Sequence, residues 1–235
     1  MTEKNAPAKD ELREGMKEAA AAADLRYLLE RGYRRDSSIR FVGDHYGIGR
    51  NDRYILARTV FSDGTARERK KKMVQCDQLQ NRSVLVDGYN VLITLESLLR
   101  GERVWLADDS FLRDIRGVFR NHSNDRFTTE AVEEMLSFFV MSEVGTACIL
   151  LDSQMKHSGD LASFIRKRMH ELSITGDAKT SKHVDHDLKN CDGSYIVATA
   201  DGIIIDSVGK VIDIPGCIYR NKASVKIPYI STNHR

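Results

Sequence analysis

The stretch "SVLVDGYNVLIT", residues 83–94, places polar side chains between two apolar runs. Residues 83–86 have the character of a buried strand, and residues 91–93 resume the apolar pattern. Asp87 and Asn90 therefore stand where a buried strand ends. Because burying an unpaired charge costs several kcal/mol, we expect Asp87 to meet a metal ion, a partner cation or a substrate.

The totals are typical of a soluble globular protein with one or two domains, since 41% of the 235 residues are hydrophobic and 30% are charged. The first twenty residues contain no secretory segment, and no apolar run approaches the roughly 20 residues of a membrane helix. We therefore expect a cytoplasmic protein with no membrane association. The four cysteines have no C-x-x-C spacing, so we expect neither a structural zinc nor a disulfide framework. Cys148 and Cys217 lie in apolar segments and are expected to be small core residues.

Charge divides the chain into two units. Residues 26–72 hold thirteen Lys or Arg against six Asp or Glu, a balance of +7, whereas residues 81–235 hold nineteen against twenty-one, a balance of −2. We expect a disordered tail over 1–9, a basic helical domain over 10–75 and an α/β domain over 80–235. Clustered basic residues favour nucleic-acid contact, and an ordinary solvated helical surface is the alternative.

The basic unit has helical patterns. Residues 10–31 predict one helix, and two shorter helices follow around Gly47 and Gly49, which is typical of a helix-turn-helix-like arrangement. Residues 62–75 could form a basic arm, a helix or a linker. The expected nucleic-acid contacts are Arg50, Arg53, Arg58, Arg69, Lys70, Lys71 and Lys72.

After residue 80, short apolar runs alternate with helical periodicity, which predicts an α/β fold with a largely parallel sheet and covering helices. We expect strands over 83–87, 147–152, 195–201 and 209–215, and helices near 91–100, 110–121, 128–143 and 159–172. Residues 203–206 and 210–214 are expected to form a hairpin-like pair.

Three of the expected strands end in an aspartate: Asp87, Asp152 and Asp201. Ligands of open α/β sheets bind beyond the carboxyl ends of the strands, where parallel strands would bring these side chains together. Neighbouring carboxylates repel each other, and Mg²⁺ or Mn²⁺ would relieve the repulsion. Asp185 or Asp187 could supply a fourth carboxylate, and either could instead cap a helix. Each strand-end aspartate alone would be an ordinary turn residue.

His183 and His186 lie beside the two acids of that segment. We expect them in solvent or near the ion rather than bound to it, because hard cations prefer oxygen ligands. Tyr89 is expected to pack against the core.

Four motifs resemble those of the NYN and PIN-like nuclease superfamily, in the same order and over residues 82–215. "VLVDGYNVL" is similar to its first motif, "ILLD" to its second strand, "VDHDL" to its acidic helix start and "VATAD" to its Thr/Ser-x-Asp strand end. The resemblance implies a PIN-like three-layer domain. The whole chain also resembles a largely archaeal group of uncharacterised proteins in which a small basic helical domain precedes such a unit.

The resemblance implies a metal-dependent ribonuclease that leaves a 5′-phosphate. By position in the motifs, Asp87, Asp152, Asp187 and Asp201 would hold Mg²⁺ or Mn²⁺, with Asp185 competing for the place of Asp187. Asn90 would contact the scissile phosphate or a bound water.

Two other functions are consistent with the sequence. One is a catalytically silent regulator that binds RNA or DNA through its helical unit. The other is a phosphatase or nucleotide-binding protein of flavodoxin-like architecture, against which the missing Gly-rich phosphate loop counts. RNA is the expected partner, DNA stays open as a substrate, and so does assembly as a homodimer.

Overall fold

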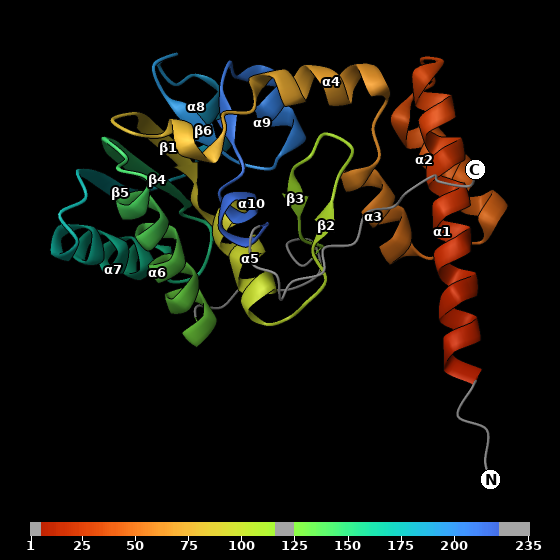
Figure 1. Ribbon diagram of the computed structural model, residues 1–235, viewed down its shortest axis with the longest axis horizontal. Helices are drawn as coiled ribbons and strands as arrows, with labels where there is room; N and C mark the ends of the chain where they lie inside the picture. Colours follow the sequence, from red (N-terminus) through yellow and green to blue (C-terminus); the bar gives the residue numbers. More distant parts are fainter. Residues whose placement is uncertain (1–5, 116–124, 221–235) are drawn as a thin grey trace, which may run out of the picture.

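The computed structural model describes residues 6–115 and 125–220. The chain begins with four helices and continues into an α/β domain (Figure 1). The helices are α1 (Ala6–Glu30), α2 (Arg35–Tyr46), α3 (Arg50–Thr59) and α4 (Asp63–Lys72). The predicted helical unit is present, and the segment 62–75, which the sequence left open, is mainly helix α4.

Local signals account for the helix ends. Gly47 ends α2 with a φ of 61°, a left-handed conformation that glycine adopts without strain. The side chain of Ser62 caps α4 by accepting a hydrogen bond from the Thr65 backbone N–H. The first three helices share one small core, which includes Leu25 of α1, Val42 of α2 and residues of α3.

Five parallel strands form the central sheet in the order β5-β4-β1-β6-β7. Their bounds are β1 (Ser83–Asp87), β4 (Thr146–Asp152), β5 (Gly176–Ser181), β6 (Ile196–Ala198) and β7 (Val211–Ile212). Counted along the chain, these strands follow the order 3-2-1-4-5. The chain therefore builds outward from β1 in both directions, as in doubly wound α/β proteins.

Helices cover both faces of the sheet, so the domain has three layers (Figure 1). Val84 and Val86 of β1 face one helical layer, whereas Leu85 between them faces the other, as the period of two requires. The first layer contains α5 (Gly88–Leu99), α6 (Arg126–Met141), α7 (Ser158–Glu171) and α10 (Ile214–Tyr219). The second contains α8 (Val184–Lys189) and α9 (Gly202–Ser207).

The sequence missed strand β5, whose residues GDAKTS lack an apolar run. An edge strand needs few buried side chains, and of these six residues only Ala178 is fully buried. The strand predicted over 203–206 is instead part of helix α9, because the Asp201 side chain accepts the first free backbone N–H groups of that helix. The predicted hairpin is therefore wrong, and β7 pairs in parallel with β6.

The helix predicted over 110–121 is also wrong where the structure describes it. Residues 105–113 form a small antiparallel hairpin of β2 (Trp105–Leu106) and β3 (Leu112–Arg113). Residues 116–124 lie outside the described part. In the hairpin turn, Ser110 has a positive φ of 70°, which interrupts the helical pattern that the sequence suggested.

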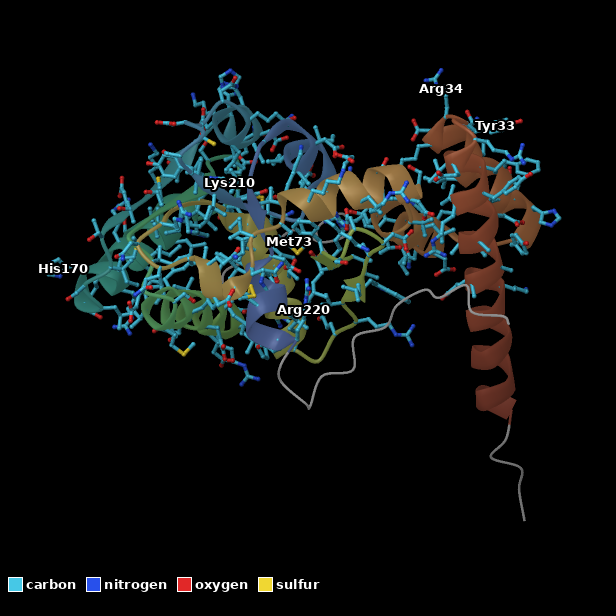
Figure 2. The ribbon with its side chains drawn as sticks, turned by 45° about the horizontal axis from the view of Figure 1, so that its top comes forward. Tyr33, Arg34, Met73, His170, Lys210 and Arg220 are labelled. Carbon is cyan, nitrogen blue, oxygen red and sulfur yellow. A yellow bond between two sulfur atoms is a disulfide. The ribbon has the colours of Figure 1, made fainter. Side chains whose placement is uncertain are left out.

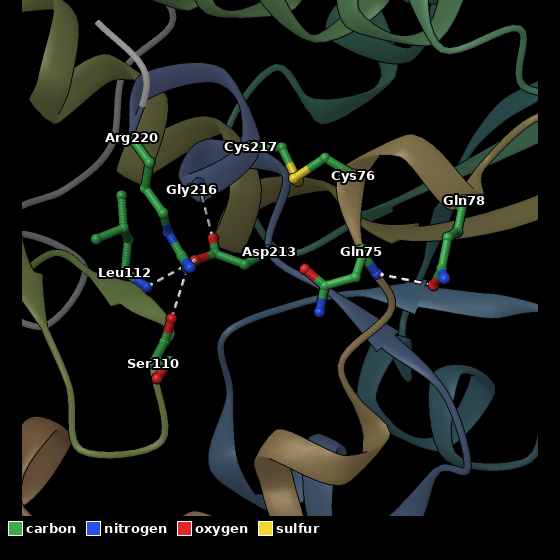
Figure 3. Close-up of a disulfide and its surroundings, with 9 residues drawn as sticks. All are labelled: Gln75, Cys76, Gln78, Ser110, Leu112, Asp213, Gly216, Cys217 and Arg220. Atoms are coloured by element: carbon green, nitrogen blue, oxygen red, sulfur yellow. Dashed lines mark hydrogen bonds and ion pairs between the residues drawn. A yellow bond between two sulfur atoms is a disulfide. The ribbon is translucent and has the colours of Figure 1, made fainter. Parts of the chain in front are cut away.

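The expectation of no disulfide is wrong as well. Cys76 and Cys217 are joined by a disulfide, with their Cα atoms 5.6 Å apart (Figure 3). Cys76 precedes β1 and Cys217 lies in α10, so the bridge joins the start of the α/β domain to its last described helix. Sequence spacing did not reveal the pair because the two cysteines are 141 positions apart in the chain. Cys148, by contrast, is partly buried against the core of the second layer, as expected of a small core residue.

Next to the disulfide, buried Asp213 accepts hydrogen bonds from the backbone N–H groups of Leu112 and Gly216, each at 2.9 Å (Figure 3). Arg220 pairs with the same carboxylate at 2.6 Å. Asp213 therefore fixes the β2–β3 hairpin against α10. In the part of the chain that the structure describes, no helix is both long and apolar enough to span a bilayer.

Candidate functional site

The site lies between β1 and β6, at the point where the order of the strands along the chain reverses. Strands β1 and β6 are neighbours in the sheet, but the chain leaves them toward opposite edges, which makes the crevice beyond their carboxyl ends the usual ligand position of such sheets. Asp87 is the last residue of β1. Asp201 follows the end of β6 and caps α9. The sequence predicted that three strand-end aspartates would meet at one edge, and hydrogen bonds through Thr199 link two of them, Asp87 and Asp201.

A single hydroxyl group connects the two aspartates. Thr199 Oγ1 donates to Asp87 Oδ2 at 2.9 Å and accepts from the backbone N–H of Asp201 at 3.1 Å. Thr199 is buried, with 1% of its surface exposed, so the bonding is set inside the protein. This Thr is the one in the "VATAD" motif, and its side chain fixes the turn from β6 into α9.

The next residue, Ala200, is held from both sides of its backbone. Its N–H donates to Asn90 Oδ1 at 2.8 Å, and its carbonyl accepts from Arg113 Nε at 2.9 Å. The Asn90 side-chain oxygen is thus engaged in holding this turn, whereas the sequence suggested contact with a phosphate or water. Ala200 cannot shift without breaking one of these bonds, so Asp201 starts from a rigid base.

The environment of Asp87 disfavours a negative charge. Burial, together with the nearby carboxylates of Asp201 and Asp185, raises the pKa of the carboxyl group to about 7, although the hydrogen bond from Thr199 acts in the opposite direction. A cation beside Asp87 would reverse this balance, because it would favour the ionised form.

Strand register places Asp152 beyond the end of β1. Asp87 lies opposite Leu150 of β4, so Asp152 extends two residues beyond the end of β1. Two residues of strand correspond to roughly 6–7 Å. Asp152 instead accepts a hydrogen bond from the Gln154 backbone N–H at 2.8 Å. Burial raises the pKa of the neighbouring Tyr89 hydroxyl to about 12, with Asp152 contributing. Tyr89 itself is only 8% exposed and packs in the core, as expected.

The two acids of α8 differ in position. Asp185 is exposed but close enough to Asp87 to raise the pKa of its carboxyl group. Asp187 accepts a hydrogen bond of 2.6 Å from the Ser181 hydroxyl at the end of β5, which lowers the pKa of Asp187. Its other oxygen lies 3.7 Å from His186 Nδ1. His183 is exposed beside them. Asp185 is thus the better candidate for a fourth carboxylate of the site.

The predicted cage of carboxylates does not form. Within residues 6–115 and 125–220, no three His, Cys, Asp or Glu side chains are arranged so that they could hold a metal ion. Mg²⁺, however, is usually held by one or two carboxylates and completes its shell with water and substrate phosphate oxygens. Asp87 and Asp201 could supply these one or two carboxylates, since both provide hard oxygen donors at one edge of the sheet.

Several arginines that could contact nucleic acid have structural roles instead. Arg69 is only 6% exposed and pairs with Asp109 at 2.9 Å and with Asp206 at 2.7 Å. Asp109 also pairs with Arg113 at 2.6 Å. This buried network joins α4 to α9 and to the hairpin. We therefore no longer expect Arg69 to bind a phosphate.

The other basic candidates are distributed unevenly. Lys72 Nζ donates to the carbonyls of Ile205 and Asp206, each at 2.9 Å, and Arg53 donates to the Ile48 carbonyl at 2.9 Å, so both are used within the protein. Lys70 and Lys71 are exposed, and Lys71 pairs with Glu68 at 2.6 Å. Arg50 is exposed at the first turn of α3.

Arg58 lines a cavity of about 560 Å³ between the helical domain and the sheet edge. Asp201, Gly202 and Ile203 of the α/β domain line the same cavity. The cavity thus joins the end of β6 to the basic unit, and it is the place where the two predicted functional regions meet. Helix α4 crosses between these units in Figure 1.

Comparison with known proteins follows the same division of the chain. Residues 76–217 match the family model described as "Domain of unknown function (DUF5616)", which is more than half of the 235 residues. The chain belongs to this family. Residues 19–72, which end at the last residue of α4, match a second model, described as "Protein of unknown function (DUF434)". The chain is also similar to "Uncharacterized protein MJ0935" of Methanocaldococcus jannaschii, with 35% identity over 196 residues, 83% of this chain and 92% of that protein. No solved structure matches the present chain.

Sequence reasoning missed Arg113, Asp109 and Arg35 as parts of this region. Arg113 and Asp109 were hidden because residues 110–121 were expected to be a helix, although two acids at 108–109 followed by an arginine at 113 were a visible signal. Arg35, near the start of α2, lines the cavity. Nothing in the local sequence distinguishes it from the other arginines of the basic unit.

Proposed function

We propose that the protein is a metal-dependent ribonuclease with a PIN-like α/β domain, and that it hydrolyses RNA phosphodiester bonds beside Asp87 and Asp201. The observation that carries the proposal is that both aspartates are hydrogen-bonded to the Thr199 hydroxyl at the point where the strand order reverses. The Asp-Gly-Tyr-Asn motif and the later acidic motifs support the same reaction by resemblance.

Asp87 and Asp201 would hold the divalent ion, with Asp185 close enough to contribute through water. When bound, Mg²⁺ or Mn²⁺ would lower the pKa of a coordinated water and neutralise charge on the phosphate. The residues of the chain orient these ligands. Thr199 fixes one oxygen of Asp87, and the doubly held Ala200 backbone fixes where Asp201 begins.

The geometry also provides a route by which a strand could reach the acids. The cavity that Asp201 lines is also lined by Arg35 and Arg58, so a polyanion would be attracted by these two guanidinium groups into a cavity that reaches Asp201. The proposal favours RNA as substrate because the resemblance is to ribonucleases, and DNA is the comparison to make in the assay.

The experiment compares the Mn²⁺-dependent cleavage of labelled single-stranded RNA by wild type, Asp87→Asn and Asp201→Asn. Asp160→Asn is the matched control, since that carboxylate lies in the first turn of α7 with its side chain 83% exposed. We expect cleavage by wild type and the control and a loss of at least about 100-fold in each site variant. Equal cleavage by wild type and Asp87→Asn, or none by wild type with either metal, would exclude the proposal.

A further inference from the structure

The cavity between the helical domain and the sheet edge has a charge pattern of its own. Three guanidinium groups surround the Phe61 ring. The distance from the guanidinium carbon Cζ to the ring centroid is 4.6 Å for Arg35, 4.4 Å for Arg69 and 5.1 Å for Arg113. Arg69 pairs with Asp109 and Asp206, and Arg113 pairs with Asp109.

Arg35 has no such partner. Its Nη2 donates to backbone carbonyls near the end of α3, those of Ala57 and Val60, the latter at 2.8 Å. Within the described residues it forms no ion pair with a carboxylate. Burial, together with the positive charges of Arg69 and Arg113, lowers the pKa of its guanidinium to about 10, although the carboxylates of Asp109 and Asp36 act in the opposite direction. An anion bound in the cavity would stabilise the protonated, positively charged form of Arg35.

Arg58 adds a second cation to the same wall. Its Nη1 donates to the Tyr54 hydroxyl at 3.1 Å, and its buried Nε has no hydrogen-bond partner in the described part of the protein. Guanidinium groups present planar donors that match phosphate oxygens. Arg35 and Arg58 together therefore form a wall suited to a phosphate group.

The rim of the cavity is apolar and exposed. Tyr33 is 61% exposed and Ile203 is 66% exposed, although large apolar side chains are more often buried. Tyr33 lies just beyond the end of α1 (Figure 2), and Ile203 lies on α9, two residues after Asp201. Exposed aromatic and apolar faces beside basic groups are what unpaired bases stack upon.

We propose that this cavity binds one nucleoside phosphate unit, its phosphate on Arg35 and Arg58 and its base against Tyr33 and Ile203. This inference rests on the proposed function in naming a single-stranded RNA as the source of that unit. The cavity volume of about 560 Å³ falls in the range of small-ligand sites. Because Asp201 is part of the lining, a strand anchored here would continue toward the proposed reaction centre.

The test measures binding without cleavage. Fluorescence anisotropy of a labelled hexauridylate is recorded in EDTA with the full chain carrying Asp87→Asn. In this background we add Arg58→Ala, Tyr33→Ala or Ile203→Ala, and compare them with two controls. Arg40→Ala removes an exposed arginine of α2, and Tyr27→Ala removes a tyrosine that is 57% exposed outside the cavity.

We expect Arg58→Ala to weaken binding about tenfold and to reduce the salt slope by about one, because one phosphate contact is lost. Tyr33→Ala and Ile203→Ala should each weaken binding several-fold, and the controls should bind as the background does. These two rim variants remain informative if Arg58→Ala does not fold. Competition by uridine monophosphate would extend the site to free nucleotides, and its absence, with the variants still weakened, would assign the site to the strand.

Equal binding by the three cavity variants and the controls would overturn the inference. If that result accompanied normal cleavage by wild type, the proposed function would stand and the RNA would bind elsewhere. If binding depended on the cavity but wild type cleaved nothing, the inference would stand and the nuclease proposal would fail.

Discussion

Asp87 and Asp201 are bonded to the same hydroxyl group, one through its side chain and the other through its backbone. Thr199, which carries that hydroxyl, also lies opposite Asp87 in the extended register of β1 and β6. Asp87 is thus positioned by strand β1, and Asp201 by the hydrogen bonds of the turn that leads from β6 into α9. Several consequences can be measured without knowing the natural substrate.

The carboxylate of Asp87 should destabilise the metal-free protein above acidic pH. With a folded pKa raised to about 7, the folded state keeps a proton that the unfolded chain loses near pH 4, so stability falls between about pH 4 and 7. Asp87→Asn removes this penalty. We expect the variant to match wild type at pH 4 and to exceed it by about 2–4 kcal/mol above pH 7, as measured by urea unfolding across this range.

The matched control for that experiment is Asp160→Asn, which neutralises an exposed carboxylate of α7. Its stability profile should run parallel to that of wild type. A constant difference between Asp87→Asn and wild type at every pH would show that the carboxyl group is not desolvated in the folded protein.

Divalent ions should stabilise wild type through the same acids. At pH 8 we expect Mn²⁺ in hundredfold excess over its dissociation constant to add about 2.7 kcal/mol of stability. Asp87→Asn and Asp201→Asn should lose most of this gain, and EDTA should remove it from wild type. Thermal unfolding with and without the ion is the measurement. An equal gain in wild type and both variants would place the ion elsewhere.

The buried network around Asp109 should hold the two parts of the chain together. Burial alone would raise the pKa of Asp109, but the adjacent Arg113 and Arg69 outweigh it and lower the pKa. Asp109→Asn would leave two buried guanidinium groups without their shared partner. We expect a loss of about 3–5 kcal/mol in the free energy of unfolding.

Glu68→Gln supplies the contrast, because it breaks an exposed pair with Lys71 whose side chains are 68% and 70% exposed. Solvent screens such pairs, so we expect no measurable shift of the urea midpoint. If Asp109→Asn lowered the free energy of unfolding as little as Glu68→Gln does, the network would not contribute to stability as we expect.

Gly88 should be required by the close packing of the first residue of α5 on β4. A Cβ at this position would lie 2.7 Å from the backbone oxygen of Leu150 and 2.6 Å from Leu151 Cδ2. Gly88→Ala is therefore expected to lower the free energy of unfolding by about 1–3 kcal/mol. Gly159→Ala in α7, where a Cβ has open space, should instead be neutral or stabilising by up to about 1 kcal/mol. Calorimetry compares the two.

The disulfide should contribute substantially to stability. Closing a loop whose ends are 141 positions apart in the chain removes conformational freedom from the unfolded chain, which corresponds to about 3–5 kcal/mol. We expect the double variant Cys76→Ser, Cys217→Ser to unfold at a lower denaturant concentration than wild type. A reducing agent should lower the unfolding midpoint of wild type to that of the double variant. The reductant should leave the double variant unchanged. A reductant that shifts both proteins equally would show that the bridge is not the cause.

The sequence predicted those parts of the fold whose residues carry a strong local signal. Strands β1 and β4 are apolar runs, and helices α6 and α7 have clear periodicity, so each was found. Strand β5 was missed because an edge strand can be polar. The run "GIIID" has the composition of a strand, but the capping bonds of Asp201 make it a helix.

The site was predictable to the same extent. Strand-end position found Asp87 and Asp201, since the direction of parallel strands follows from the α/β pattern. The pairing register is not written in local sequence, and it places Asp152 two residues beyond Leu150, the residue opposite Asp87. The pairing of Arg69 with Asp109 and Asp206 joins distant segments, so no reading of the basic run at 69–72 could separate a buried arginine from exposed lysines.

The Cys76–Cys217 bridge also determines how the protein would respond to mechanical load. Tension applied at the two chain ends would pass through α4 to Cys76, cross directly to Cys217 and leave toward residue 235. The sheet and its covering helices form a closed covalent loop that carries none of this tension. Stretching the oxidised molecule would thus unravel the helical unit while the proposed reaction centre stayed folded, and only reduction would expose the rest to the pull.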